Sequence, residues 1–464
     1  MRRISESKVT AGDWEALQGA IDGKVALPES PAYEGVVKPF NARFHKMQPG
    51  AIVLCASPQD VSETVSFLHR HGLENAIRSG GHCFAGHSST QGVLIDVSPM
   101  YSLSVSGGVA TIGAGGRLGK VYEALQMHHV TIPGGTCPPV GIAGLTLGGG
   151  LGILGRKYGV TSDLLIGAQI VLADGSILDC DAHHHEDLFW ALRGAGSGNF
   201  GVVTSLTFRT VPVPQITNFH LKWPFHHAVP VIESWQRWAP TGPDELAASL
   251  KVTATGDVDR APSVDIYGAL IGTESDAMTL LDELVGQLGT DPISASSRQM
   301  TFSDTRRFWA ELGAEEVQAG ESPSSLVAQP YLFTKSEFFK RPLPGEAILA
   351  LVDNFSRGRA SGESRELDFM PWGGAYNRVK PEATAFVHRD EMFQLKHAAT
   401  VDLQAPASQK ADAHRWVLRS WASVHPWGSG RVFQNFVDPE LEGWMDAYYG
   451  TNAERLVRVK AQYD

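Results

Sequence analysis

The stretch GGTCPPVGIAGLTLGGG, residues 134–150, decides the fold class. It holds seven glycines and a single cysteine, Cys137, which is followed directly by Pro138 and Pro139. Glycine permits positive φ and lets a backbone approach another group closely, while the prolines stiffen the chain. No helix N-terminus or His/Asn partner marks the cysteine as a nucleophile. The pattern predicts a rigid loop that holds a thiol in a fixed position.

Two further glycine-rich segments accompany this loop. The segment RSGGHCFAGHSS, residues 78–89, carries glycine and serine amides that can form an anion-binding nest. Taken alone, its histidine, His82, is more simply explained as a loop residue that makes a backbone hydrogen bond. The segment GSGNFG, residues 196–201, matches G-x-G-x-x-G, but a helix-like run precedes it and a strand-like run follows it. A dinucleotide fingerprint needs the opposite order, so we expect no Rossmann fold.

Length and charge limit the class of protein. The chain has 464 residues, which favours two domains. Its formal net charge is −11 and it has no long basic run, so we expect no nucleic-acid partner. No apolar stretch reaches the roughly 18–20 residues that span a bilayer, so we expect no membrane partner. The N-terminal stretch MRRISESKVTAGDWEAL, residues 1–17, begins basic but lacks the apolar region of a secretory signal, and we expect a cytoplasmic protein.

We expect no metal site. The four cysteines, Cys55, Cys83, Cys137 and Cys180, are not spaced as metal ligands or as a disulfide framework. Three adjacent histidines at 183–185 do not share one face of a strand. The sequence gives no indication of the oligomeric state.

Alternating strand-like and helix-like runs predict an α+β protein. LLIGAQIVLADGSILDC, residues 164–180, is typical of a β-hairpin. After about residue 214 strand-like runs such as LAASLKVTAT alternate with helix-like runs such as DAMTLLDELVGQLG. We expect a first domain over 1–212, a substrate domain with an antiparallel sheet flanked by helices over 213–395, and a C-terminal segment over 396–464 that returns to the first domain.

Five segments together resemble the berberine-bridge-enzyme-like flavoprotein oxidases, and the likeness covers essentially the whole chain. They are AIVLCASPQDVSETVSF, RSGGHCFAGHSS, GGTCPPVGIAGLTLGGGLGILGRKYGVTSDLL, HEDLFWALRGAGSGNFGVVTSLTF and NAERLVRVKAQYD. The resemblance implies a two-part FAD-binding domain of the p-cresol-methylhydroxylase (PCMH) type. It also implies that FAD is covalently bound, with His82 on the flavin 8α-methyl carbon and Cys137 on C6. The glycines would then let the chain lie flat against the flavin ring.

The resemblance also implies which residues surround the cofactor and how oxygen reaches it. Val140, three residues after the cysteine, is expected to leave room for O2, which favours an oxidase. The residues expected to bind FAD are His82, Cys137, Arg78, Ser79, Gly80, Gly81, Ser88, Gly135, Thr136, Val140, Gly141, Gly144, Gly149, Gly152, Gly201, Val203 and Asn435.

The chain departs from the family pattern where the catalytic groups are expected. Leu145 stands where many members carry a histidine, and Phe433 and Leu151 stand where they carry tyrosines. The catalytic proton acceptor must therefore lie elsewhere. The segment LDFMPWGGAYNRV offers Tyr376 and Asp368, with Tyr376 expected on one face of a strand together with Gly374 and Arg378. Both remain candidates, with Asn435 as a hydrogen-bonding residue near the ring.

Two functions follow from the resemblance. The first is an FAD-linked oxidase that transfers a hydride from an alcohol, sugar or secondary-metabolite carbon to flavin N5, with O2 reduced to H2O2. The second is a flavoprotein of natural-product biosynthesis that carries out oxidative cyclisation, oxygenation or ring closure. In both cases the partner is a small molecule, and release of peroxide during turnover separates the two.

Overall fold

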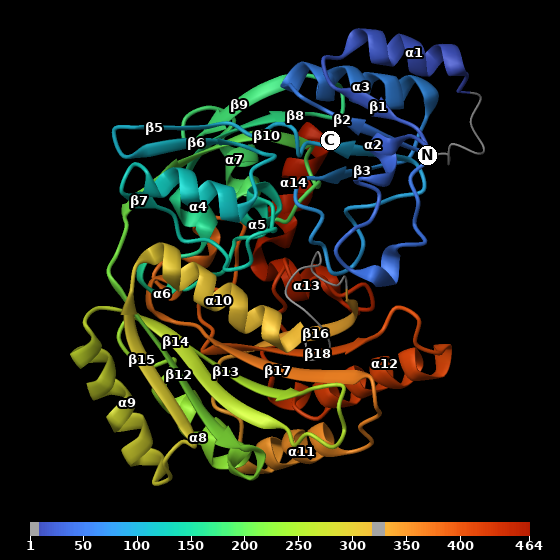
Figure 1. Ribbon diagram of the computed structural model, residues 1–464. Helices are drawn as coiled ribbons and strands as arrows, with labels where there is room; N and C mark the ends of the chain where they lie inside the picture. The colour runs from blue at the N-terminus through green and yellow to red at the C-terminus, as the bar shows by residue number, and fades with distance from the viewer. Residues whose placement is uncertain (1–8, 318–329) are drawn as a thin grey trace.

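The computed structural model describes residues 9–317 and 330–464. The first eight residues of the N-terminal stretch on which the expectation about a signal region depends lie outside these ranges. Figure 1 shows two stacked halves, with the N-terminal part of the chain above and a large sheet with its helices below. Within the described ranges, no helix is both long and apolar enough to cross a bilayer.

The upper half begins with a four-stranded sheet in the order β1-β2-β4-β3. Strands β2, β4 and β3 are parallel, whereas β1 pairs antiparallel with β2. All four residues of β4 are buried, as expected for a parallel strand that is covered on both faces. The elements are α1 (Ala11–Ala20), β1 (Lys24–Ala26), α2 (Pro31–Glu34), β2 (Ala51–Leu54), α3 (Pro58–His71), β3 (Asn75–Arg78) and β4 (Val93–Asp96).

A five-stranded antiparallel sheet in the order β5-β6-β10-β8-β9 completes the upper half. The predicted hairpin is confirmed, since β8 and β9 pair antiparallel. The GSGNFG loop follows the helix α7 and precedes the strand β10, which is the reverse of the order in a Rossmann fingerprint. The elements are β5 (Leu103–Ser106), β6 (Val109–Gly113), α4 (Leu118–Gln126), β7 (Val130–Thr131), α5 (Ile142–Leu147), α6 (Gly155–Tyr158), β8 (Leu165–Val171), β9 (Ile177–Asp181), α7 (Glu186–Leu192), β10 (Val202–Arg209) and β11 (Val211–Pro212).

The lower half is a seven-stranded antiparallel sheet in the order β15-β12-β14-β13-β17-β18-β16. Its elements are β12 (Ile216–Pro224), α8 (Ala228–Trp238), β13 (Leu246–Ala254), β14 (Ser263–Ile271), α9 (Glu274–Leu288), β15 (Ser294–Met300), α10 (Phe302–Val317), β16 (Tyr331–Phe339), α11 (Gly345–Ser356), β17 (Glu363–Pro371), β18 (Phe393–Val401) and α12 (Ala407–Ala422). This architecture is the α+β fold with an antiparallel substrate sheet that the sequence predicts.

The two faces of this sheet differ in character. On one face, apolar side chains such as Leu250, Phe369 and Leu395 join Trp235 and Trp416 of the flanking helices in one buried core. The helices α8, α11 and α12 lie on this side of the sheet in Figure 1, away from the upper half. Because successive side chains on a strand point to opposite faces, the neighbours of these residues are directed toward the upper half.

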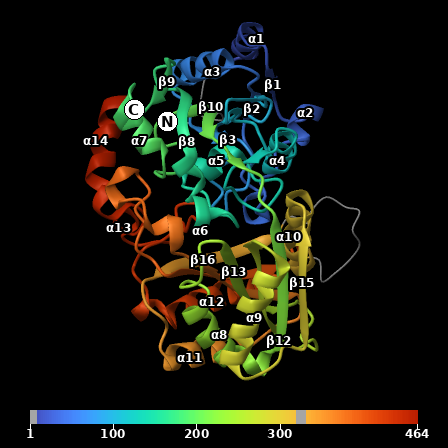
Figure 2. The ribbon, with the colours of Figure 1, turned by 90° about the vertical axis from the view of Figure 1, so that its left-hand side faces the viewer.

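The chain leaves the lower half later than expected. The boundary at residue 396 falls inside β18, which pairs along its length with both β16 and β17. The connection between β17 and β18 already touches the upper half, where the Ala385 N–H donates to the Trp190 carbonyl. After α12 the chain crosses to the upper half and ends with α13 (Trp444–Tyr449) and α14 (Ala453–Tyr463), the latter against α7. Figure 2 shows α13 and α14 along the side of the upper half.

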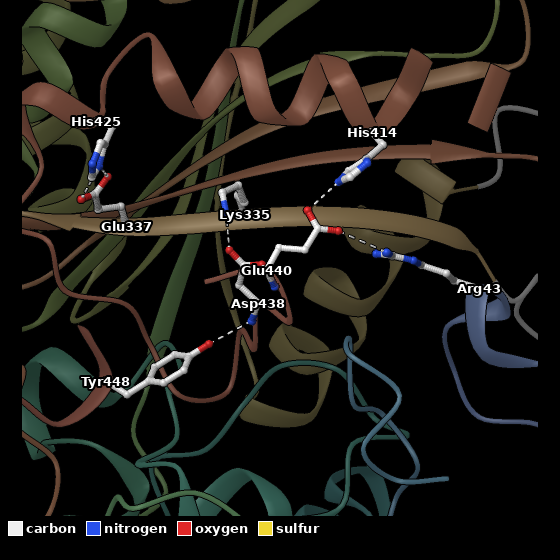
Figure 3. Close-up of polar contacts among 8 residues, drawn as sticks. All are labelled: Arg43, Lys335, Glu337, His414, His425, Asp438, Glu440 and Tyr448. Carbon is white, nitrogen blue, oxygen red and sulfur yellow. Dashed lines mark hydrogen bonds and ion pairs between the residues drawn. The ribbon is translucent and has the colours of Figure 1, made fainter. Parts of the chain in front are cut away.

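Polar contacts hold the crossing segment, residues 428–440, against the lower half (Figure 3). Asp438 forms a buried ion pair with Lys335 of β16, and its backbone N–H donates to the Tyr448 hydroxyl at 2.9 Å. Glu440 lies 2.9 Å from His414 of α12, and Glu440 also pairs with Arg43 of the upper half at 3.5 Å. The segment is thus fixed to both halves, which determines where the residues just before Asp438 lie.

Candidate functional site

A cavity of about 650 Å³ lies between the glycine-rich loops of the upper half and the polar face of the lower sheet. This volume is within the range of about 300–1,000 Å³ that small-molecule and cofactor sites occupy. The glycine-rich loops around residues 80, 140 and 200 form its upper wall, and strands β13, β14, β17 and β18 form its lower wall. Residues 433–437 of the crossing segment close one side.

Two glycine-rich loops meet backbone to backbone in the upper wall. A Cβ atom at Gly80 would collide with the backbone of Gly141, and a Cβ at Gly141 would collide with Gly80 and with the Ser79 hydroxyl. Ser79 Oγ donates to the Ala114 carbonyl at 2.6 Å. This hydrogen bond fixes the loop of residues 78–89 to the end of strand β6. The glycines are therefore required by the close approach of the two loops.

His82 and Cys137, from two different loops, line the same cavity. The His82 ring stacks on Phe40 with 3.8 Å between ring centroids. Burial lowers the pKa of His82 to about 4, so its imidazole is neutral at physiological pH. The Cys137 side chain is open to the cavity, although the enclosing protein raises the pKa of its thiol.

The positions that depart from the family pattern also lie at the cavity. Leu145, Leu151 and Phe433 all line it and present apolar surface there. Asn435 lines it as well, and its Nδ2 donates to the Leu145 carbonyl of α5 at 2.9 Å. This hydrogen bond joins the crossing segment to the glycine-rich loop that carries Cys137.

The lower wall carries a group of charged side chains. Asp368 of β17 and Lys396 of β18 line the cavity, and the Lys396 ammonium lies 3.1 Å from Asp368 Oδ2. The other oxygen, Asp368 Oδ1, is buried and has no hydrogen-bond partner among the described residues. A buried acceptor without a partner costs free energy. The carboxylate is nevertheless held in the cavity wall through the contact of Oδ2 with Lys396.

The prediction that Tyr376 lies on a strand is wrong. Strand β17 ends at Pro371, and Tyr376 lies in the 3-10 helix η5 (Gly374–Asn377). Gly373 and Gly374 both have positive φ, 88° and 58°, and this turns the chain out of the extended conformation. The Tyr376 ring stacks on Trp372 at 4.2 Å, and its hydroxyl donates to the Gly152 carbonyl at 3.1 Å. Burial raises the pKa of this phenol far above its ordinary value, which makes it a poor proton acceptor.

Most of the residues expected at the site face one cavity. Besides those described above, the lining includes Gly81, Ser88, Gly135, Thr136, Val140, Gly144, Gly152, Gly201 and Val203. Arg78 and Gly149 are not among the lining residues. The Arg78 guanidinium donates to the carbonyls of Val36, Val37 and Ser88 and holds those loops together. Gly149 packs against the ring of Phe386.

Four residues of the cavity lining carry no local sequence pattern that marks them as site residues. Lys251, Tyr267, Trp309 and Lys396 all face the cavity, and the Tyr267 and Trp309 rings lie 5.2 Å apart. Alternation along a strand indicates which residues share a face, but it does not indicate which face borders a cavity. Lysines on a strand are therefore easily assigned to a solvent-exposed face.

The adjacent histidines engage other groups. His184 Nδ1 lies 3.1 Å from Asp181, and His185 Nδ1 lies 3.3 Å from the Tyr463 hydroxyl. Over residues 9–317 and 330–464, the structure has no group of three or more His, Cys, Asp or Glu residues arranged to hold a metal ion.

The cavity fits FAD, the cofactor that the resemblance implies. The backbone of the two glycine-rich loops forms a cradle in which added Cβ atoms would collide with neighbouring backbone. The Ser88 hydroxyl lines the cavity and, among the described residues, has no hydrogen-bond partner. A neutral imidazole and an accessible thiol face the same space. Ser79–His82, Ser88, Gly135–Cys137 and Gly141 are the residues that would hold the cofactor.

Comparison with known proteins agrees with this assignment. A family model described as an FAD binding domain matches residues 49–181, and one described as berberine and berberine like matches residues 432–464. The FAD-linked oxidoreductase YgaK of Bacillus subtilis is 31% identical over 453 residues, covering 96% of this chain and 94% of its own. The chitooligosaccharide oxidase of Gibberella zeae is 32% identical over 442 residues, covering 92% of this chain and 86% of its own.

Solved structures show the same architecture. The structure of BBE-like 1 from Physcomitrella patens superposes with a TM-score of 0.85 at 26% identity, and the match covers 97% of this chain and 96% of that one. A chitooligosaccharide oxidase structure superposes with a TM-score of 0.84 at 28% identity and covers 97% of each chain. The likeness therefore includes both halves and the segment that crosses between them.

Proposed function

Because the chain belongs to the berberine bridge enzyme-like family of FAD-linked oxidoreductases, we propose that it oxidises an alcohol or hemiacetal carbon of a small molecule and passes the electrons to O2. The binding of FAD and the oxidation chemistry follow from the family. The further elements of the proposal are covalent attachment of FAD at His82 and Cys137, release of hydrogen peroxide, and the use of Asp368 as the proton acceptor.

The observation that carries the proposal is the position of Asp368. Asp368 lines the cavity that His82 and Cys137 also line, and its carboxylate is held there by the Lys396 ammonium. When bound, FAD supplies an acceptor for the hydride that leaves the substrate carbon. The substrate hydroxyl must lose its proton as the C=O bond forms, and the Asp368 carboxylate takes that proton. The two electrons and two protons then reduce O2 to hydrogen peroxide.

The apolar and aromatic lining residues orient the substrate. Tyr267 and Trp309 line the lower part of the cavity, with their ring centroids 5.2 Å apart, and aromatic side chains offer large apolar surface to a bound molecule. Phe433 and Leu151 present apolar surface where phenols are expected in the family. They exclude water from the reacting atoms without taking part in proton transfer.

Measurement of peroxide during turnover tests the proposed reaction. The purified holoenzyme is incubated in air with chitobiose, cellobiose and a set of primary and benzylic alcohols, and peroxide is followed with a coupled peroxidase. Chitobiose is included because one relative is named a chitooligosaccharide oxidase. We expect peroxide and carbonyl product in a 1:1 ratio with at least one of these compounds. Anaerobic reduction of the flavin without peroxide in air would favour cyclisation or another acceptor.

Val140 provides a prediction about oxygen. Its backbone is fixed on both sides, since its N–H donates to Cys137 O at 3.2 Å and its carbonyl accepts from Leu118 N at 2.9 Å. A larger side chain at this cavity-lining position therefore cannot move away. We expect Val140→Leu to slow reoxidation of the reduced enzyme by air severalfold and to leave anaerobic reduction unchanged, as measured by stopped-flow absorbance. Equal reoxidation rates would exclude a gating role, and Val140→Ala is the matched control.

A further inference from the structure

A row of charged residues with alternating sign crosses the lower sheet. Its members stand opposite one another in the register of five neighbouring strands, β12, β14, β13, β17 and β18. In that order they are Lys222, Asp265, Lys251, Asp368 and Lys396. Residues opposite one another on antiparallel strands lie on the same face, with Cβ atoms about 4.5–5.5 Å apart. The last three members of the row line the cavity.

Lys396 lies between two carboxylates. Its ammonium is 3.1 Å from Asp368 Oδ2 and 3.0 Å from Glu366 Oε1. Glu366 is two residues before Asp368 on β17 and therefore shares its face. Burial alone would lower the pKa of Lys396, but Glu366 and Asp368 together raise it above its ordinary value. The lysine thus remains a cation throughout the working pH range.

The second carboxylate matters when Asp368 changes its charge. A buried cation that loses its only partner is strongly destabilising. If Asp368 alone held Lys396, protonation of Asp368 would leave the ammonium without a counter-ion. Glu366 keeps Lys396 paired whether Asp368 is charged or neutral. The ion pair between Lys396 and Glu366 therefore stays in place while the charge of the Asp368 carboxylate changes.

We propose that Lys396 and Glu366 are positioning residues that set the protonation state of Asp368. This inference rests on the proposed function only in assigning the catalytic proton to Asp368. Lys396 favours the ionised form of Asp368 before turnover, and its contact with Oδ2 orients the carboxylate. Glu366 reduces the net attraction of the lysine for Asp368, so that Asp368 can hold a proton for long enough to complete the reaction.

Other charged and titratable groups act on the same site. From β13, Lys251 lies 3.5 Å from Glu366, and its ammonium is 5.1 Å from the centre of the Tyr267 ring on β14. From the upper half, Cys137 is close enough for Lys396 and Lys251 to lower its pKa. These groups remain in place in the variants below, so each variant reports the removal of one charge.

Infrared titration of the holoenzyme tests the inference without a substrate. The carboxylic-acid band of Asp368 is identified by subtracting the spectrum of Asp368→Asn, and its midpoint is followed with pH. An opposite charge within about 4–6 Å shifts such a midpoint by about 1–3 pH units. We expect Lys396→Met to raise the midpoint by about that amount, because the ionised form loses its partner. We expect Glu366→Gln to lower it, because a neighbouring negative charge is removed.

The matched controls distinguish positioning from packing. Lys396→Arg keeps the charge, and its midpoint is expected to lie close to that of the wild type. Lys222→Met removes a lysine of the same row, outside the cavity lining, and is expected to leave the midpoint unchanged. Shifts in the same direction for Lys396→Met and Glu366→Gln, or no shift in either, would overturn the inference. Should Lys396→Met fail to fold, Lys396→Gln and Glu366→Gln supply the same comparison.

The titration and the turnover of Asp368→Asn can fail independently, so a failure of the positioning inference can be told from a failure of the proposed function. If Asp368→Asn turns over substrate at the wild-type rate, the assignment of Asp368 as proton acceptor is wrong even when the titration behaves as expected. If Asp368→Asn is inactive but the midpoint does not respond to Lys396 or Glu366, the proton acceptor stands and the positioning inference fails.

Discussion

FAD should separate from the acid-denatured double variant His82→Ala/Cys137→Ala, whereas it should stay with the denatured wild-type chain and with each single variant. The reason is that two covalent bonds, from two separate loops, would each suffice to retain the flavin after unfolding. Both side chains line one cavity, and the neutral imidazole and the accessible thiol are both suited to bond formation. The measurement is yellow colour in the precipitate and the mass of the intact denatured chain.

The same loop provides the matched control for this experiment. His87 and Cys83 also line the cavity and lie within five residues of His82. The double variant Cys83→Ala/His87→Ala removes one imidazole and one thiol from the cavity wall, yet it should retain FAD on denaturation. Loss of FAD from the denatured wild-type chain would refute covalent attachment. Loss from only one of the two single variants would show that one tether exists and not two.

Asp368→Asn should slow reduction of the flavin by substrate by about 10²–10⁴-fold, which is the usual contribution of a general base. The change replaces one oxygen by an amide nitrogen of similar size, so packing is nearly conserved. Reoxidation by O2 should be unaffected, because no proton is taken from the substrate in that step. Anaerobic stopped-flow measurement at saturating substrate separates the two steps.

Tyr376→Phe is the control for this prediction. It removes a hydroxyl that donates to Gly152 and that lies in a fully buried ring stack. We expect a reduction rate within about threefold of the wild type, with a loss of stability of about 1 kcal/mol from the lost hydrogen bond. A large loss of rate in Tyr376→Phe together with a normal rate in Asp368→Asn would reverse the assignment of the proton acceptor.

The upper wall of the cavity could be predicted from sequence because its composition is constrained locally. The glycines around His82 and Cys137 are needed wherever two loops approach backbone to backbone, and Gly80 and Gly141 show this contact directly. Such a requirement leaves a pattern within a few residues of the chain. The order of α7 and β10 around residues 196–201 is likewise a local signal, and it excludes the Rossmann interpretation of that loop.

The lower wall could not be predicted in the same way, because its residues are brought together by strand register. Asp368, Lys396 and Lys251 are far apart in the sequence and become neighbours only through the pairing of β13, β17 and β18. The prediction that Tyr376 lies on a strand extends the alternation of β17 beyond Pro371. Two glycines with positive φ end that alternation, and nothing in the pattern of apolar residues marks the change.

The crossing segment has a consequence for the timing of maturation. Residues 433–437 close one side of the cavity, and Lys335 and Asp438 hold them in place. During translation these residues leave the ribosome after both sheets have been synthesised. The cavity can therefore be enclosed only after residues 433–437 have been added to the chain, which is later than both sheets. Premature termination after α12 would remove this wall, and it would also remove α14, whose Lys460 donates to the Asn199 carbonyl of the glycine-rich loop 196–201.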